Sequence, residues 1–203
     1  MTFEVKIQDD GLRRDLAVVK PNGKAKLTEA GAYSLYVAVM RHVKAYARTH
    51  HASANRLGAQ PTGHFEDGVD DISYGQDGNG AASVTIPIRG FSRVFGDVTI
   101  TPRNEKALTL PINAISYGRR AREMRRLGFT LFTFGKKEGG VNGVLYGYRD
   151  GDDHIEPLYA LKSRVTLRQD RSMLPSDKDM TNAVQDGMMA AIRSAMRTAR
   201  RSA

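Results

Sequence analysis

A long run of apolar residues at helical spacing near the N-terminus constrains the fold of this chain more than any other feature. The residues of this run recur every three or four positions and are Ala32, Leu35, Tyr36, Val39, Val43 and Ala47. Thr28 is a candidate N-cap, and the pattern runs on toward Leu57 and Gly58. It predicts a helix of about 30 residues, roughly 45 Å long, with one face packed in a core.

A second helix is predicted at the other end of the chain. Ser176 and Asp179 have the spacing of a capping box, with Asp in place of Glu. Apolar residues then repeat at helical spacing from Met180 to Ala199, and we expect the helix to end near Arg200.

Between these helices, short segments alternate apolar and polar residues, as half-buried strands do. The predicted strands cover residues 83–88, 98–101, 108–110, 129–134, 144–148 and 157–165. An opening strand with Phe3, Val5 and Ile7, followed by a short helix with Leu12 and Leu16, precedes the long helix. This order predicts an α+β fold, in which an antiparallel or mixed sheet packs against the long N-terminal helix and the C-terminal helix.

The length of the chain, 203 residues, is typical of one domain. We expect a single α+β domain, residues 1–203, with four parts. These are a strand with helices at 1–58, an acidic glycine-rich loop at 59–81, the sheet at 82–175 and the C-terminal helix at 176–203. A short arginine-rich helix at residues 116–128, capped by Ser116 and ended by Gly128, is predicted as an insertion in the sheet.

The absence of cysteine excludes several classes of protein. A disulfide framework, an iron–sulfur cluster, a thiolate zinc site and a cysteine nucleophile all need thiols, and the chain has none. The longest uncharged stretch of the first helix, residues 30–40, is much shorter than the roughly 20 residues of a membrane span. The first residues carry an acid and a base where a secretory signal would be apolar. We therefore expect no membrane partner, and a protein that is retained inside a cell or packaged from one.

Two segments of opposite charge stand out in a chain whose net charge is +9. Residues 116–137 hold seven Lys and Arg residues against one acid, Glu123, and the arginines are Arg119, Arg120, Arg122, Arg125 and Arg126. Residues 61–81 hold five acids and no Lys or Arg, and the acids include Glu66, Asp67, Asp70 and Asp71. Exposed arginines can neutralise DNA phosphates without reading the sequence. Equally, they can pair with the acidic segment of the same subunit or of an adjacent one.

The sequence offers little support for catalysis. His50, His51 and His64 lie near the acidic segment, but no His-x-x-x-His or His-Glu-x-x-His pattern places two metal ligands on one helix face. A Gly-x-Ser-x-Gly nucleophile motif and a phosphate-binding loop are also missing. We expect no enzyme activity, no metal and no cofactor. A metal-dependent hydrolase that uses the three histidines is the weakest of the alternatives.

Several short motifs carry a resemblance to a known family through their order along the chain. Thr62-Gly63-His-Phe65 is similar to a Thr-Gly-x-Leu turn into a sheet. Leu110-Pro111-Ile112 and Gly118-Arg119-Arg120-Ala121 are similar to a segment of apolar-Pro-apolar followed by Gly-basic-basic-Ala. Leu131-Phe132, residues 157–163 and the C-terminal helix follow in the same order. Over most of its length the chain resembles the virion-morphogenesis or tail-completion proteins of tailed bacteriophages, in the Mu-like group and more distantly of the lambda minor tail protein Z type.

The resemblance implies a structural, non-catalytic protein whose subunits form a cyclic ring at the head–tail junction. Such a ring closes the tail tube as a terminator or joins it to the head connector as an adaptor. The partners implied are further copies of the chain, other neck, connector and tail-tube proteins, and packaged DNA through non-specific contacts. The location implied is the virion, after assembly in the host cytoplasm. The chain departs from the family at Met173-Leu174-Pro175-Ser176, where many members have a Pro-Phe pair.

Two hypotheses about the charged segments follow. A cyclic ring joins two different patches of each subunit, so the acidic segment and the arginine helix are candidate subunit contacts. The alternative is a basic DNA-binding accessory protein that contacts phosphates through the helix from Arg119 to Arg126. Its affinity for DNA would fall steeply as the salt concentration rises.

Overall fold

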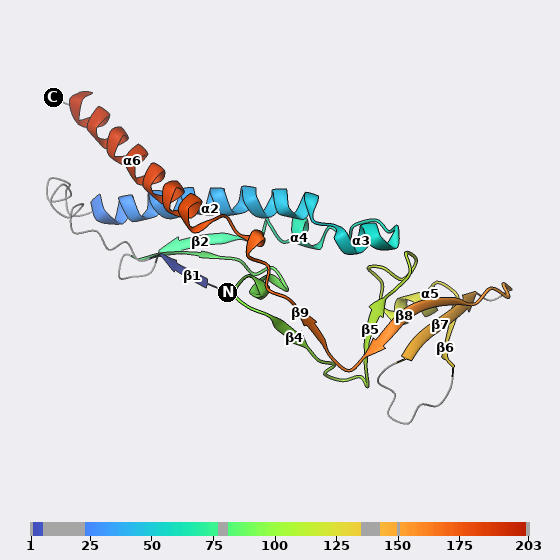
Figure 1. Ribbon diagram of the computed structural model, residues 1–203. Helices are drawn as coiled ribbons and strands as arrows, with labels where there is room; N and C mark the ends of the chain where they lie inside the picture. The colour runs from blue at the N-terminus through green and yellow to red at the C-terminus, as the bar shows by residue number, and fades with distance from the viewer. Residues whose placement is uncertain (1, 6–22, 77–80, 135–142, 150, 202–203) are drawn as a thin grey trace. The chain divides into compact units, whose positions relative to one another are not determined.

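The computed structural model describes residues 2–5, 23–76, 81–134, 143–149 and 151–201 (Figure 1). Contacts within the chain divide it into two compact units, where the sequence alone predicts one domain. Unit 1 consists of Met1–Thr49, His64–Val94 and Asp170–Ala203, and unit 2 consists of His50–Gly63 and Phe95–Gln169. The chain therefore passes from one unit to the other four times. Each unit has a hydrophobic core of its own.

Unit 1 is built around two long helices, α2 (Gly23–Thr49) and α6 (Asp177–Arg201). Helix α2 buries the apolar face that the sequence predicts from Ala32 to Ala47, with Tyr36 half-buried, and it also buries Leu27. The predicted cap at Thr28 is wrong, because the helix begins earlier and the Thr28 hydroxyl donates a hydrogen bond to the Lys24 carbonyl at 3.0 Å. No helix in the described part of the chain is long and apolar enough to span a membrane.

The helix that the sequence predicts to reach Leu57 is two helices in the structure. Helix α2 ends at Thr49, and α3 (Ala52–Leu57) follows in unit 2. His51 between them has φ −110° and ψ 30°, so the regular helical conformation does not continue through it. Helix α3 then ends at Gly58, where the apolar pattern of the sequence also stops.

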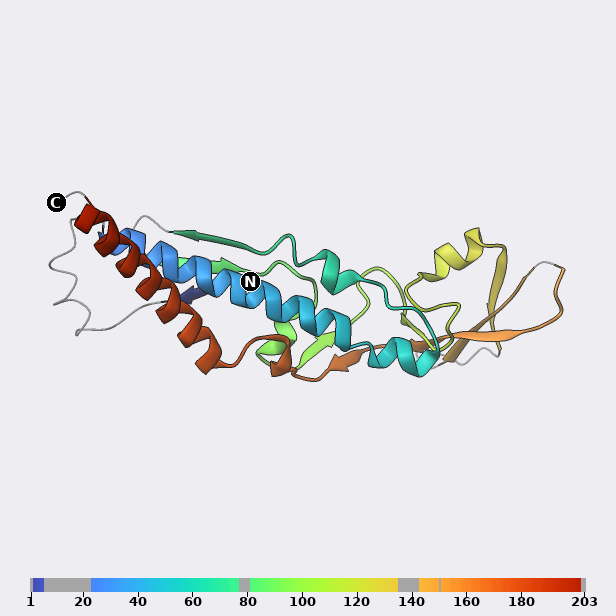
Figure 2. The ribbon, with the colours of Figure 1, turned by 90° about the horizontal axis from the view of Figure 1, so that it is seen from above.

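Helices α2 and α6 cross obliquely and in close contact (Figures 1 and 2). Each helix has a glycine at the crossing. A Cβ on Gly31 would lie 3.1 Å from a methyl carbon of Val184. A Cβ on Gly187 would overlap with Ser34 and would lie 2.5 Å from the Ala30 carbonyl oxygen. The two glycines therefore allow the backbones of the two helices to approach each other.

The sheet of unit 1 has three antiparallel strands in the order β1 (Thr2–Val5), β3 (Ala82–Thr85) and β2 (Ser73–Gln76). Val84 is the register partner of both Phe3 and Tyr74. Helix α2 packs against β2 and β3. The opening strand of the sequence analysis is confirmed up to Val5, whereas Ile7 and the predicted short helix with Leu12 and Leu16 lie outside the described residues.

The acidic segment, predicted to be a loop from residue 59 to 81, contains two elements instead. These are α4 (His64–Asp67) and strand β2. The physical reason is that Val69 and Ile72, between the acids, are buried in the core of unit 1 and hold the segment against it. The acidic side chains around them stay exposed.

The core of unit 1 lies between α2, α6, the sheet and two short 3₁₀ helices. The 3₁₀ helices are η1 (Phe91–Val94) and η2 (Arg171–Met173). The most deeply buried side chains of this core are Val43, Val69, Val84, Ile86, Phe91, Val94 and Met173. The core thus joins residues from all three segments of unit 1.

Unit 2 contains two antiparallel sheets. The larger has the strand order β5 (Leu108–Pro111), β8 (Glu156–Lys162), β7 (Gly143–Arg149) and β6 (Phe129–Thr133). The smaller pairs β4 (Val98–Ile100) with β9 (Val165–Leu167). One strand predicted at 157–165 is therefore two strands, because the pairing partner changes from β5 and β7 to β4. The long helices and antiparallel sheets confirm the predicted α+β class, although the strands form three sheets instead of one.

The arginine-rich helix is shorter than the sequence predicts. Helix α5 (Ala121–Arg126) begins after Arg120, and Ser116 does not cap it. The hydroxyl of Ser116 is buried and donates to the Leu158 carbonyl of β8 at 2.6 Å, and Gly118 interrupts the segment with a positive φ of 72°. Helix α5 packs on one face of the large sheet in a core made of Met124, Phe129, Leu158 and Tyr159.

Candidate functional site

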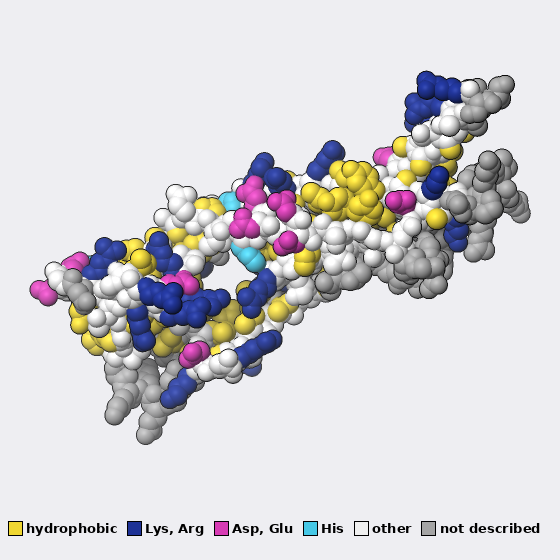
Figure 3. Space-filling view, turned by 180° about the vertical axis from the view of Figure 1, so that it is seen from behind, with side chains coloured by type: hydrophobic (Ala, Val, Ile, Leu, Met, Phe, Trp, Pro, Cys, Tyr) yellow, Lys and Arg dark blue, Asp and Glu magenta, His cyan; other side chains and the backbone are white. Residues whose placement is uncertain are grey.

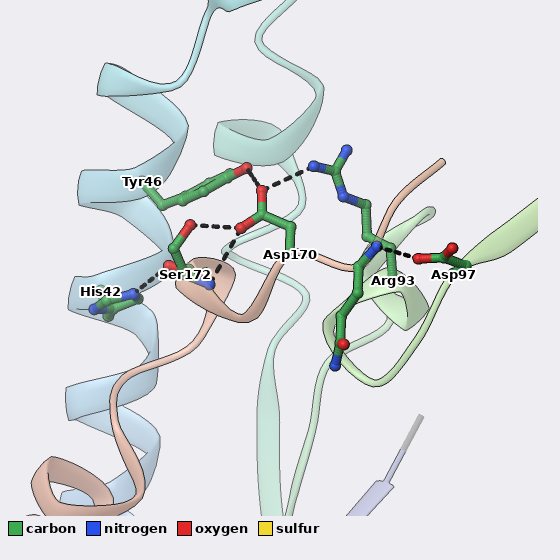
Figure 4. Close-up of polar contacts among 7 residues, drawn as sticks. His42, Tyr46, Arg93, Asp97, Asp170 and Ser172 are labelled. Carbon is green, nitrogen blue, oxygen red and sulfur yellow. Dashed lines mark hydrogen bonds and ion pairs between the residues drawn. The ribbon is translucent and has the colours of Figure 1, made fainter. Parts of the chain in front are cut away.

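A partly buried polar network in unit 1 has Asp170 at its centre (Figure 4). One carboxylate oxygen accepts hydrogen bonds from the Tyr46 hydroxyl at 2.7 Å and from Arg93 Nη2 at 2.8 Å. The other oxygen accepts from the backbone N–H of Ser172 at 3.2 Å and from its hydroxyl at 2.5 Å. His42 Nε2 on α2 lies 2.8 Å from the Ser172 carbonyl oxygen. The network therefore holds η1 and η2 against α2.

The network changes the acidity of two of its members. Burial and the hydrogen bond to Asp170 raise the pKa of Tyr46 to about 12. Burial opposes ionisation of Asp170, but the hydrogen bonds from Ser172 and Tyr46 and the charge of Arg93 outweigh it and lower the pKa of Asp170. At neutral pH the tyrosine stays protonated and the carboxylate stays ionised, so neither group is poised to transfer a proton. We interpret the network as a structural anchor at the places where the chain leaves and re-enters unit 1.

The predicted cationic site lies on α5 and the turn before it, in unit 2. Its five side chains are all exposed and are Arg119, Arg120, Arg122, Arg125 and Arg126. Arg119 Nη1 donates to the Ile115 carbonyl at 2.5 Å, and the backbone N–H of Arg120 donates to the Glu123 carboxylate at 2.8 Å. The side chains of the other three arginines form no hydrogen bond or ion pair with any residue that the structure describes. Helix α5 therefore presents positive charge that the described chain does not neutralise.

The predicted acidic site lies on α4 and the turn after it, in unit 1. Its four side chains are exposed and are Glu66, Asp67, Asp70 and Asp71. Glu66 is already engaged, because Arg48 Nε on α2 donates to its carboxylate at 3.1 Å. On the face drawn in Figure 3, acidic side chains gather in one place beside exposed Lys and Arg side chains. The acidic site belongs to unit 1, whereas the cationic site belongs to unit 2.

A third surface, which the sequence analysis does not single out, lies on the large sheet of unit 2. Phe132 of β6 and Tyr146 and Tyr148 of β7 point away from the face that α5 covers, and Phe134, which directly follows β6, packs against their rings. Phe132 and Tyr146 are register partners with ring centroids 6.1 Å apart, and the ring centroid of Phe134 lies 4.9 Å from that of Tyr146. We call these four residues the aromatic face. In the sequence, aromatic residues at every second position are the signal for this face, and the same alternation predicts the strands.

The histidines do not form a metal site in the structure. His64 Nε2 lies 3.2 Å from the Arg89 carbonyl oxygen in unit 1, whereas His50 and His51 belong to unit 2. Across the described ranges, no group of three or more His, Asp or Glu side chains is placed to hold a metal ion.

The described residues thus present a cationic and an aromatic surface on unit 2 and an acidic surface on unit 1. No protein-family model, curated protein or solved structure matches this chain.

Proposed function

We propose that this chain is a non-catalytic structural protein of a tailed bacteriophage, a ring-forming subunit that completes the tail or joins it to the head connector. It would lie in the virion at the head–tail junction after assembly in the host cytoplasm. Its partners would be further copies of itself and neighbouring neck, connector or tail-tube proteins. The order of motifs along the sequence supports this proposal, and so do the exposed surfaces of the two units.

The observation that carries the proposal is the positive charge on α5 that has no partner in the described chain. Met124 anchors this short helix in the core of unit 2, while Arg122, Arg125 and Arg126 stay exposed. A subunit of a cyclic ring needs two different patches that complement each other, because each copy contacts one neighbour with each patch. Surfaces of opposite sign on one chain have this complementarity and fix the orientation of a contact.

The test is the composition of phage particles. Particles from a lysate are separated on a density gradient, and mass spectrometry counts this chain relative to the major structural proteins. We expect a low and fixed copy number that is the same in independent preparations. A chain that stays in the soluble fraction and is absent from the particles would contradict the proposal.

The arginines of α5 also favour one alternative, a DNA-binding accessory protein. Guanidinium groups without a partner can each neutralise a phosphate, and each such contact makes binding more sensitive to salt. Titration of duplex DNA at several salt concentrations separates the two functions. An accessory protein binds with a steep salt slope that flattens when Arg122, Arg125 and Arg126 are replaced by Gln. A ring subunit binds DNA weakly. The control variant is Arg103→Gln, which removes an exposed arginine outside α5.

A further inference from the structure

The aromatic face of unit 2 has the composition of the centre of a protein interface. Its rings contact one another across two strands, with the ring planes of Phe132 and Tyr146 inclined by 26° and the centroids of Phe132 and Phe134 5.1 Å apart. Phe134 at the margin of this cluster is 64% exposed. Interface centres are enriched in aromatic residues and depleted of charged ones. A partner that covers Phe134 would remove this apolar surface from water.

Helix α5 lies on the opposite side of the same sheet. Because side chains alternate between the faces of a strand, Phe129 and Leu131 of β6 point toward α5, whereas Phe132, the residue after Leu131, points away. On α5 itself, Met124 packs on the sheet. Arg122 and Arg126, two residues to either side of Met124, lie about half a helical turn away from it. One copy of unit 2 therefore presents arginines on one side and aromatic rings on the other.

We infer that the aromatic face receives the α5 arginines of a second copy of this chain. Guanidinium groups bind over the faces of aromatic rings. The chain already contains one such contact, since the guanidinium carbon of Arg149 lies 5.0 Å from the centre of the Phe129 ring. The inference rests on the proposed function, because it names the contact through which ring subunits join. A contact between two different sides of the unit repeats head to tail and closes into a ring when its rotation permits.

The charges at the Tyr148 end of the aromatic face fit the same occupant, whereas Lys136 and Lys137 follow Phe134 at its other end. The turn that follows β7 carries exposed Asp152 and Asp153, and no Lys or Arg occurs from residue 150 to residue 161. These acids complement arginines that extend past the rings. The acidic site of unit 1 is the weaker counterpart, because Glu66 already forms an ion pair with Arg48.

Single-cysteine variants test the contact directly, because the chain has no cysteine of its own. Leu127→Cys places a thiol at the exposed end of α5. Thr130→Cys places a thiol on β6, on the side of the aromatic face. Both variants keep every arginine and every aromatic ring. Under mild oxidation, a mixture of the two variants should form the mixed disulfide faster than Leu127→Cys mixed with Asn104→Cys, an exposed control site in the same unit. Faster formation with Asp70→Cys than with Thr130→Cys would overturn the inference in favour of the acidic site.

Sedimentation of the full chain separates failure of this inference from failure of the proposed function. Phe134→Ser and the double variant Arg122→Gln/Arg126→Gln should each weaken self-association by at least about tenfold. Mixed together, these two variants should form one-to-one pairs, because each supplies the surface that the other lacks. Ile100→Ser, an exposed apolar residue of strand β4 in the same unit, is the matched control, and circular dichroism checks the fold of each variant.

Two outcomes of the sedimentation experiment would overturn the inference. The first is self-association that is unchanged in both variants. This result would not affect the particle count, which tests the proposed function. The second is a wild-type chain that stays monomeric. Binding of a single-stranded oligonucleotide that Phe134→Ser abolishes would then identify the aromatic face as a surface for stacked bases.

Discussion

The carboxylate of Asp170 joins segments of unit 1 that are far apart in the sequence, binding both Tyr46 and Arg93. Asp170→Asn removes the charge and leaves Arg93 without its ion pair. We expect the free energy of unfolding at pH 7 to fall by about 1–3 kcal/mol. Urea unfolding followed by circular dichroism measures this change. The control is Asp186→Asn at an exposed site of α6, which should change the free energy of unfolding by no more than about 0.5 kcal/mol.

The same carboxylate makes the stability depend on pH. Its pKa is lower in the folded chain than in the unfolded chain. Its contribution is therefore present above the unfolded pKa of about 3.9 and is lost as the pH falls through the lower folded value. The difference in unfolding free energy between wild type and Asp170→Asn should thus shrink below about pH 4. A difference that stays constant in acid would show that packing of the side chain, and not its charge, stabilises the fold.

Contacts of single residues are predictable from the sequence only where the partners are close along the chain. The cap at Ser176 is confirmed, because its hydroxyl accepts a hydrogen bond from the Asp179 N–H at 3.1 Å, three residues on. The same reasoning at Ser116 is wrong, because its hydroxyl contacts the carbonyl oxygens of Asn113 and of the distant Leu158 in β8, and not a helix N–H. The partners of Asp170 are equally remote, so no spacing rule could have found the network.

At the scale of elements, the crossing of α2 and α6 depends on the glycine at position 187. A Cβ there would lie 2.5 Å from the backbone carbonyl oxygen of Ala30, which cannot rotate aside as a side chain can. Alanine is favoured over glycine by about 1 kcal/mol in a helix. Gly187→Ala should nevertheless lower the free energy of unfolding by about 1–3 kcal/mol, because overpacking forces the helices apart. Thermal unfolding followed by circular dichroism measures the loss.

Gly31→Ala is the matched comparison for this prediction. Its Cβ would have as its nearest neighbours side-chain carbons of Val184 and Met188, at 3.1 and 3.2 Å, which can shift. The gain in helix propensity should largely offset the crowding and leave a change within about 1 kcal/mol. Equal destabilisation by the two variants would contradict the argument that the backbone contact at Gly187 sets the distance between the helices.

The types of most elements are predictable from the sequence, and each feature that the sequence does not predict has a physical reason of its own. Strands β4 to β7 lie where alternation predicts them, since a half-buried strand shows its two faces in its own sequence. Strand β2 was missed because all four of its residues are exposed and carry no alternation. The boundary between β8 and β9 was missed because it depends on a change of partner strand, which the segment itself does not record.

At the scale of the whole molecule, the sequence predicts the α+β class but not the division into two units. The class follows from the order of helices and strands. The division depends on which distant segments contact each other, and unit 1 alone is assembled from three separate parts of the chain. The candidate surfaces differ in the same way. The charged sites are visible in composition, whereas the aromatic face exists only once the register pairs Phe132 with Tyr146.

Separate cores lead to a prediction about how the whole chain unfolds. Met124 is fully buried in the core of unit 2, and Met124→Ala should lower the free energy of unfolding of that unit by about 2–5 kcal/mol. Hydrogen exchange should then show loss of protection in β6, β7 and β8, while the amides of α2 in unit 1 keep theirs. Met196→Ala at an exposed site of α6 is the control for the same substitution. Equal loss of protection in α2 and β7 would contradict the prediction, because such a loss would mean that the two cores unfold together as one cooperative unit.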